Sequence, residues 1–171
     1  MKKTYLFLLV AAGGLLASWV MKSMNKPTLK YFKPSEFGVW YPLMSNDLLL
    51  KLDKFREAWG GPVIVSSADG AVGRRDDHSR SQHNVNVWGE VRAVDIFPKV
   101  GGRYIETSEE LERAFDIAKA VGFSGIGVYT DTSPGHMLHV DVRSTRDTIW
   151  SRIAGTYKYG APGLADAGIV A

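Results

Sequence analysis

The chain has 171 residues, of which 45% are hydrophobic and 23% are charged, so it suits one folded domain with an appendage and excludes a disordered or fibrous chain. It contains no cysteine, which excludes a disulfide scaffold, a thiol nucleophile and a cysteine-ligated zinc finger. Its net charge of +3 comes from residues 1–26, which carry four lysines and no acid, whereas residues 27–171 carry 17 basic and 18 acidic side chains. We therefore expect no nucleic-acid partner.

Residues 1–26 predict a membrane-targeting segment. The 18 uncharged residues between Lys3 and Lys22 would form a helix about 27 Å long, just short of a bilayer core of about 30 Å. An uncleaved signal-anchor is favoured; a cleaved signal peptide and a buried helix are the alternatives, and no clear cleavage motif follows the apolar stretch. An anchor would hold residues 27–171 on the periplasmic side of the inner membrane, and cleavage would release a secreted domain.

Residues 27–171 are predicted to form the domain, with a core over about residues 31–153. N-capping residues at 45–47 begin a helix that ends at a Gly-Gly pair. Residues 62–67 predict a buried strand, and the polar residues 69–82 predict a long loop. The apolar positions of the helix have helical spacing: Leu48, Leu49, Leu52, Phe55 and Trp59.

A second strand is predicted over residues 92–97 and should end at Pro98. Thr107 and Glu110 have the spacing of a capping box, which predicts a second helix, and Gly122 should end it. The apolar face of this helix would consist of Leu111, Ala114, Phe115, Ala118 and Val121.

Two further strands are predicted over residues 125–129 and 137–142, joined by a turn at 131–135. Beyond Ile149 the pattern weakens: Trp150 and Ile153 should pack on the domain, and residues 160–171 should form a frayed tail. Strands and helices mix without regular alternation. This order predicts an α+β fold with a small, largely antiparallel sheet and flanking helices.

Without cysteine, a metal site must use histidine and carboxylate ligands. Asp95 lies in the middle of one apolar strand and His139 in the middle of another, where an unpaired carboxylate would be costly to bury. The two side chains can compensate each other by binding one cation, or they can form a buried hydrogen-bonded pair. The chain has four histidines: His78, His83, His136 and His139.

Four short motifs follow one another in order: S-x-H with Ser81 and His83, A-x-D with Ala93 and Asp95, GIGVY at 125–129, and HVDVR at 139–143. Together they resemble the zinc D-Ala-D-Ala carboxypeptidase family, and most of all its murein peptidase domains from phages and bacteria. The resemblance spans about residues 32–150. It implies a Hedgehog/DD-peptidase-like fold and a zinc ion bound by His83, Asp95 and His139.

The chain departs from this family in two places. Eleven residues separate His83 from Asp95 where the family has six, which makes His78 an alternative ligand. Several members of the family place an acidic general base three residues before the last histidine, and here that position holds His136. The base is therefore His136, Asp141 or another acid. Asp141 shares a strand face with His139, so it is also a candidate partner for the outer nitrogen of that ligand.

Three further residues are candidates for substrate contacts. Arg74 or Arg75 resembles the family's loop arginine, which would hold a substrate carboxylate or the developing oxyanion; the alternative is a solvated loop arginine. Ser81 would orient the loop or the substrate, or it is a turn residue. Trp88, in the insertion between the ligands, is a candidate for stacking on a sugar.

The resemblance implies a zinc-dependent peptidase that cleaves stem peptides or cross-links of bacterial peptidoglycan. A phage or prophage lysis enzyme and a cell-wall remodelling carboxypeptidase both fit, acting as a monomer held at the inner membrane by the N-terminal helix. The predicted targeting segment agrees with this function independently, since peptidoglycan lies in the periplasm. The alternative is a non-catalytic, membrane-tethered wall-binding or virion structural protein that keeps the fold.

Overall fold

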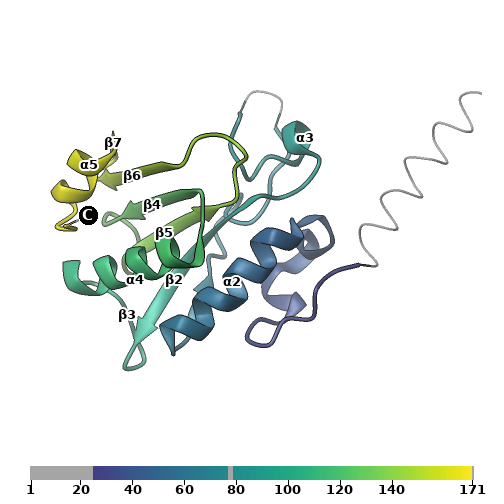
Figure 1. Ribbon diagram of the computed structural model, residues 1–171, viewed down its shortest axis with the longest axis horizontal. Helices are drawn as coiled ribbons and strands as arrows, with labels where there is room; N and C mark the ends of the chain where they lie inside the picture. The colour runs from purple at the N-terminus through teal and green to yellow at the C-terminus, as the bar shows by residue number, and fades with distance from the viewer. Residues whose placement is uncertain (1–24, 77–78, 171) are drawn as a thin grey trace, which may run out of the picture.

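The fold is α+β, with one mixed sheet of seven strands and flanking helices, in a computed structural model that describes residues 25–76 and 79–170 (Figure 1). The strands are β1 (Val63–Val65), β2 (Ala93–Val100), β3 (Arg103–Tyr104), β4 (Gly125–Tyr129), β5 (Met137–Asp141), β6 (Thr148–Ile153) and β7 (Thr156–Tyr159). The helices are η1 (Pro34–Leu43), α2 (Asn46–Trp59), α3 (Val85–Trp88), α4 (Ser108–Val121) and α5 (Ala161–Asp166).

The sheet has the strand order β1-β2-β5-β4-β6-β7, and β3 pairs with β2. Of the pairs between these described strands, β4 and β6 run parallel and all others run antiparallel. The predicted α+β class with a largely antiparallel sheet is thereby confirmed.

Both predicted helices are present, and their ends follow the sequence signals. Helix α2 ends at Gly60, which takes a left-handed conformation with φ of 73°. Helix α4 begins with the predicted capping box: the Thr107 hydroxyl accepts from the Glu110 amide at 3.3 Å, and the Glu110 carboxylate accepts from the Thr107 amide at 3.4 Å. Gly122 ends α4 with φ of 90°.

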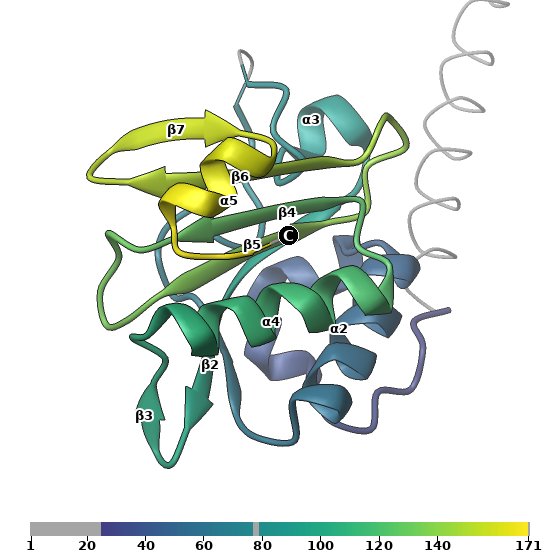
Figure 2. The same ribbon diagram turned by 60° about the vertical axis from the view of Figure 1, so that its left-hand side comes forward.

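The two faces of the sheet have different roles. Helices α2 and α4 pack together on one face, and α5 packs beside them on β6 and β7 (Figures 1 and 2). Strand residues that point to this face are fully buried in the main core, among them Val94, Val140 and Val128. Because side chains alternate along a strand, Asp95, His139 and Trp150 point to the opposite face. The candidate site therefore lies on the face that α2, α4 and α5 leave open.

Two details of the first strands differ from the prediction. Strand β2 continues past Pro98 to Val100. Proline lacks an amide hydrogen, but at this position the backbone only has to accept a hydrogen bond: the Pro98 carbonyl accepts from the Ile105 amide at 3.2 Å. Strand β1 is not buried throughout, since the Ile64 side chain is exposed. Strand β1 is therefore an edge strand in which Val63 is buried and Ile64 is exposed, although both are apolar.

The C-terminal prediction was wrong. Residues 160–170 do not form a frayed tail: β6 and β7 make a hairpin, and α5 packs against it with Leu164 and Ile169 buried. Gly163 makes this contact possible, because a Cβ atom there would lie 2.1 Å from the Lys158 carbonyl oxygen. The prediction failed because Leu164 and Ile169 are too few apolar residues to show helical spacing in a segment rich in glycine and alanine.

The predicted membrane segment falls on residues 1–24, which lie outside the described residues. Its last two predicted residues are described: the Asn46 side-chain amide donates to the Asn25 carbonyl at 3.0 Å, and Lys26 donates to the Asn46 side chain at 3.3 Å. Among the helices at 25–76 and 79–170, none is long and apolar enough to cross a membrane.

A matched pair of substitutions tests the packing of the C-terminal segment. Leu164→Ala removes a side chain that is 0% exposed and should destabilise the protein by about 2–5 kcal/mol. Val170→Ala changes a side chain that is 86% exposed and should alter the stability by less than about 0.5 kcal/mol. Urea unfolding of the two variants measures the difference; equal stabilities would mean that residues 160–170 contribute nothing to the core.

Candidate metal centre

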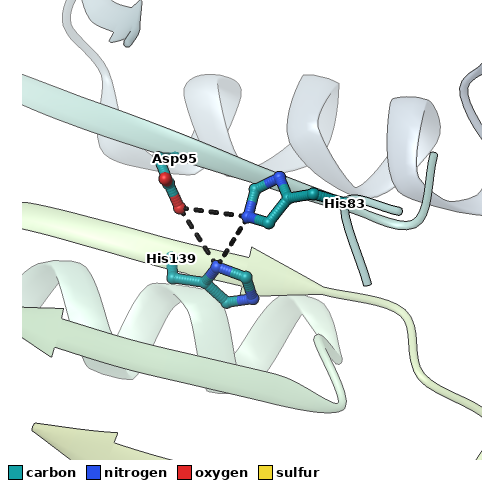
Figure 3. Close-up of side chains that lie close together, drawn as sticks. All are labelled: His83, Asp95 and His139. Atoms are coloured by element: carbon teal, nitrogen blue, oxygen red, sulfur yellow. Dashed lines mark hydrogen bonds and ion pairs between the residues drawn. The ribbon is translucent and has the colours of Figure 1, made fainter. Parts of the chain in front are cut away.

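Three predicted ligand atoms converge on one point (Figure 3). The His83 Nε2 atom lies 3.1 Å from His139 Nδ1, which in turn lies 3.0 Å from Asp95 Oδ1. The remaining distance, from His83 Nε2 to Asp95 Oδ1, is 3.5 Å. These three residues can hold a metal ion between them.

The sheet and the loop before it position these side chains. Asp95 on β2 and His139 on β5 are directly opposite in the antiparallel register, so both point to the same face. His83 comes from the end of the loop, where its amide donates to the Ser81 hydroxyl at 3.4 Å and its carbonyl accepts from the Arg74 amide at 3.1 Å. Ser81 therefore helps to hold the backbone of a ligand, in agreement with its predicted role in the loop.

Each histidine has an inner ring nitrogen, which faces the other two residues of the cluster, and an outer ring nitrogen, which points away from them. Both outer nitrogens contact hydrogen-bond acceptors. His83 Nδ1 lies 3.0 Å from the Val72 carbonyl oxygen, and His139 Nε2 lies 3.1 Å from Asp141 Oδ2. We assign a proton to each outer nitrogen, since a carbonyl or carboxylate oxygen can only accept. The inner nitrogens of the two neutral rings and Asp95 Oδ1 then present three lone pairs to one another. A cation at this point, either a metal ion or a proton, removes the repulsion.

Asp141 is buried completely and fixes the His139 ring. Its carboxylate accepts from the Arg143 side chain, with Nε at 2.9 Å from Oδ1. Burial raises the pKa of Asp141, but the hydrogen bonds from Arg143 and His139 outweigh burial and hold the pKa well below its usual range. Asp141 therefore orients the His139 ring, a contact that suits the partner role among the roles that the sequence left open for it.

Two glycines of β4 make room for this arrangement. A Cβ atom on Gly125 would lie 2.1 Å from Asp141 Oδ2, and one on Gly127 would lie 2.4 Å from the Trp150 ring. The Trp150 ring packs beside His139 with 5.0 Å between centroids, and its Nε1 donates to the Tyr129 hydroxyl at 3.1 Å. Sequence reasoning missed these roles of Trp150 and the glycines; two glycines at alternate positions of one strand were the available signal.

The charges at the centre reinforce one another. Burial raises the pKa of Asp95, but hydrogen bonds from His139 and His83 hold it well below its usual range. Burial lowers the pKa of His139, whereas its hydrogen bonds to Asp141 and Asp95 raise it, and the net effect is a pKa of about 9. Without a metal ion, the cation between the three ligands is therefore a proton on His139.

Of the other two histidines, the structure describes only His136, which is not part of this cluster. His136 directly precedes β5, its amide donates to the Ile105 carbonyl at 2.8 Å, and it does not belong to the residues that line the cleft at the ligands. His78 lies outside the described residues.

The eleven residues between His83 and Asp95 are folded. They include the short helix α3, which Asn84 caps by accepting from the Asn86 amide at 3.1 Å and which Gly89 ends in a left-handed conformation, and the first two residues of β2. The helix lies at the margin of the domain beside the loop (Figure 2). The insertion therefore leaves His83 and Asp95 together.

The ligand atoms face a cleft of about 470 Å³. Arg74 lines it, with an ion pair to Asp76 at 3.3 Å and a hydrogen bond to the Ser79 hydroxyl at 3.2 Å. Cations outnumber carboxylates in the lining, which includes Arg74, Arg80, Arg143, Arg152, Asp69 and Asp95. Arg74, Arg143 and Arg152 are each paired with a carboxylate, of Asp76, Asp141 and Asp131, so these guanidinium groups offer the cleft hydrogen-bond donors more than net positive charge.

Comparisons with protein-family models, with curated proteins and with solved structures found no match to this chain.

Histidine substitutions test the metal site. His83→Ala and His139→Ala each remove one of three ligands and should weaken the binding of a divalent transition metal ion at least 100-fold. His136→Ala is the matched control, since it removes a histidine that lies outside the cleft and should keep the affinity within about threefold. Metal content after dialysis and calorimetric titration give the numbers. Equal loss in all three variants would mean that the ligands are not those assigned here.

Metal binding should release a proton. With the His139 pKa raised to about 9, the ring is doubly protonated at pH 7.5, so an ion that binds at Nδ1 displaces about one proton. The apparent affinity should therefore rise with pH and level off above pH 9. Calorimetric titration in two buffers of different ionisation enthalpy measures the proton count, and no release at pH 7.5 would contradict the prediction.

Proposed function

We propose that the protein is a zinc-dependent peptidase that cleaves stem peptides or cross-links of bacterial peptidoglycan. The observation that carries the proposal is the convergence of His83, Asp95 and His139 in an arginine-lined cleft. Three protein ligands beside an open cleft are typical of catalytic zinc sites, which keep one position for water or substrate.

The donor set suits zinc and excludes a typical magnesium or calcium site. Two imidazoles and one carboxylate suit zinc, whereas magnesium and calcium prefer oxygen ligands alone. Zinc bonds of about 2.0–2.1 Å in tetrahedral geometry place neighbouring ligand atoms about 3.3 Å apart. The three observed separations of 3.0, 3.1 and 3.5 Å lie around this value.

A zinc ion in this position would polarise the scissile carbonyl and lower the pKa of a water molecule towards about 7. Asp141 and the Val72 carbonyl keep the two imidazoles oriented. Among the described residues that line the cleft, Asp69 is the carboxylate that is not a ligand, and its side chain is exposed. We assign to Asp69 the role of proton acceptor, in place of His136.

The guanidinium groups of the cleft support a peptide substrate with free carboxylates, because they can donate hydrogen bonds to such groups. Arg74 is half-exposed there and can pair with such a group, as the resemblance to the carboxypeptidase family implies. The α+β fold is compatible with the Hedgehog/DD-peptidase-like fold of that family. Peptidoglycan stems carry several carboxylates and lie in the periplasm, where a signal-anchor or signal peptide at residues 1–26 would deliver the domain.

Digestion of purified sacculi by the full chain in mild detergent tests the function. We expect soluble peptides or shortened stems in the mass spectrum, and no product with a chelator or in His83→Ala. Loss of a terminal D-Ala would identify a carboxypeptidase, and opened cross-links or freed stems an endopeptidase.

Asp69→Asn should lower kcat about 10²–10⁴-fold while the protein keeps its zinc.

Asp116→Asn, on the exposed face of α4, is the matched control and should leave the rate unchanged. A zinc-loaded wild-type protein that yields no products would contradict the enzyme proposal. That result would favour the alternative, a non-catalytic wall-binding or virion structural protein.

A further inference from the structure

Aromatic side chains extend the cleft away from the metal ligands. Across the sheet, His139, Gly127, Trp150 and Tyr159 are successive partners on β5, β4, β6 and β7. Tyr129 and Tyr157 lie in the neighbouring row, where both are partners of Arg152. The tyrosines and Trp150 line the same cleft as the ligands.

The inner and outer rings differ in exposure. Tyr129 and Trp150 are each 7% exposed, whereas Tyr157 is 51% and Tyr159 is 65% exposed. Each outer ring rests on an inner one: Tyr157 packs edge-on against Tyr129 at 6.0 Å between centroids, and Tyr159 packs tilted against Trp150 at 6.3 Å. These contacts hold the outer rings in place and leave much of their surface free.

We propose that Tyr157 and Tyr159 form a carbohydrate subsite that continues the metal cleft. The inference rests on the proposed function and deepens it: the substrate would be a stem peptide that is still attached to its sugar chain. A pyranose ring has an apolar C–H face and a rim of hydroxyl and acetamido groups. A tyrosine ring with its phenol hydroxyl, beside the guanidinium of Arg152, offers the matching apolar and polar surfaces.

The distance between the two ends of the cleft supports a ligand of this size. The His139 ring lies 5.0 Å from the Trp150 ring, and the Trp150 ring lies 6.3 Å from the Tyr159 ring, so the two ends of this row are at most about 11 Å apart. A free dipeptide in extended form spans only about 7 Å. A ligand that follows the row from His139 to the outer face of Tyr159 must therefore be longer than a dipeptide.

The size of the exposed surface argues against a protein partner. The two outer tyrosines together offer on the order of 200 Å² of side-chain surface. A stable protein interface needs about 800 Å² on each partner. A pair of single sugar rings fits the smaller area.

Trp88, the residue that the sequence suggested for sugar stacking, does not line the cleft. Its Nε1 donates to the Ser81 carbonyl at 2.9 Å, and the Arg92 guanidinium lies over its ring at 5.1 Å. Trp88 thus supports the loop before His83. We therefore assign sugar stacking to the tyrosines of β7 instead.

Binding of a peptide-free oligosaccharide tests the subsite without catalysis. The full chain in mild detergent is titrated with the tetramer of N-acetylglucosamine, and tryptophan fluorescence and calorimetry report binding. We expect the Tyr157→Ala/Tyr159→Ala variant to bind at least tenfold more weakly than wild type, and Tyr157→Phe/Tyr159→Phe to keep most of the affinity. Tyr31→Ala, a tyrosine beside α2 outside the cleft, is the matched control and should bind as wild type does.

A second readout separates this proposal from the peptidase itself. In the double alanine variant, KM for sacculi should rise about tenfold, with kcat and the hydrolysis of free stem peptide unchanged. Wild type that digests sacculi and binds no oligosaccharide at millimolar concentration would overturn the sugar subsite alone. Equal loss of activity on free peptide and on sacculi would also overturn it, since the tyrosines would then contact the peptide. Tyrosine-dependent oligosaccharide binding without hydrolysis would support the subsite and overturn the peptidase.

Discussion

The structure depends on one electrostatic constraint, which is the close approach of three acceptor atoms inside a protein. His83, Asp95 and His139 come from a loop and two strands, and their facing atoms lie within 3.5 Å of one another. Since both outer ring nitrogens contact oxygen acceptors, a neutral ring has no proton on its inner nitrogen. The three facing atoms then repel one another unless a cation lies between them, either a metal ion or the second proton of His139. The three residues can therefore hold a cation at this point.

The face of the sheet around the ligands is shaped to hold His139. Gly125 admits the Asp141 carboxylate, and Gly127 admits the Trp150 ring, so the imidazole lies between an anion and an aromatic plane. A side chain at either glycine would displace one of the two supports. The same Trp150 ring carries Tyr159 on its other side. Trp150 thus supports both the His139 ring and the outer tyrosine Tyr159.

The sequence predicted the features that local signals encode. Capping residues and helical spacing identified α2 and α4, and short motifs singled out His83, Asp95 and His139, which the structure brings together. The C-terminal hairpin and α5 were missed because Leu164 and Ile169 are buried through contacts between distant segments. His136 does not line the cleft: it precedes β5, and its amide is held by the Ile105 carbonyl. Trp150 could not be assigned, since its contact with His139 exists only across the sheet.

The insertion between the first two ligands has a structural role of its own. Asn84 follows His83 directly, is fully buried, and donates through its side-chain amide to the carbonyls of Asp76 at 2.8 Å and Ser79 at 2.7 Å. Its side-chain oxygen also caps α3. One residue thereby joins the loop that bears Arg74 to the insertion, immediately beside a ligand. The segment between His83 and Asp95 thus contributes, through Asn84, to holding the described residues on both sides of His83 together.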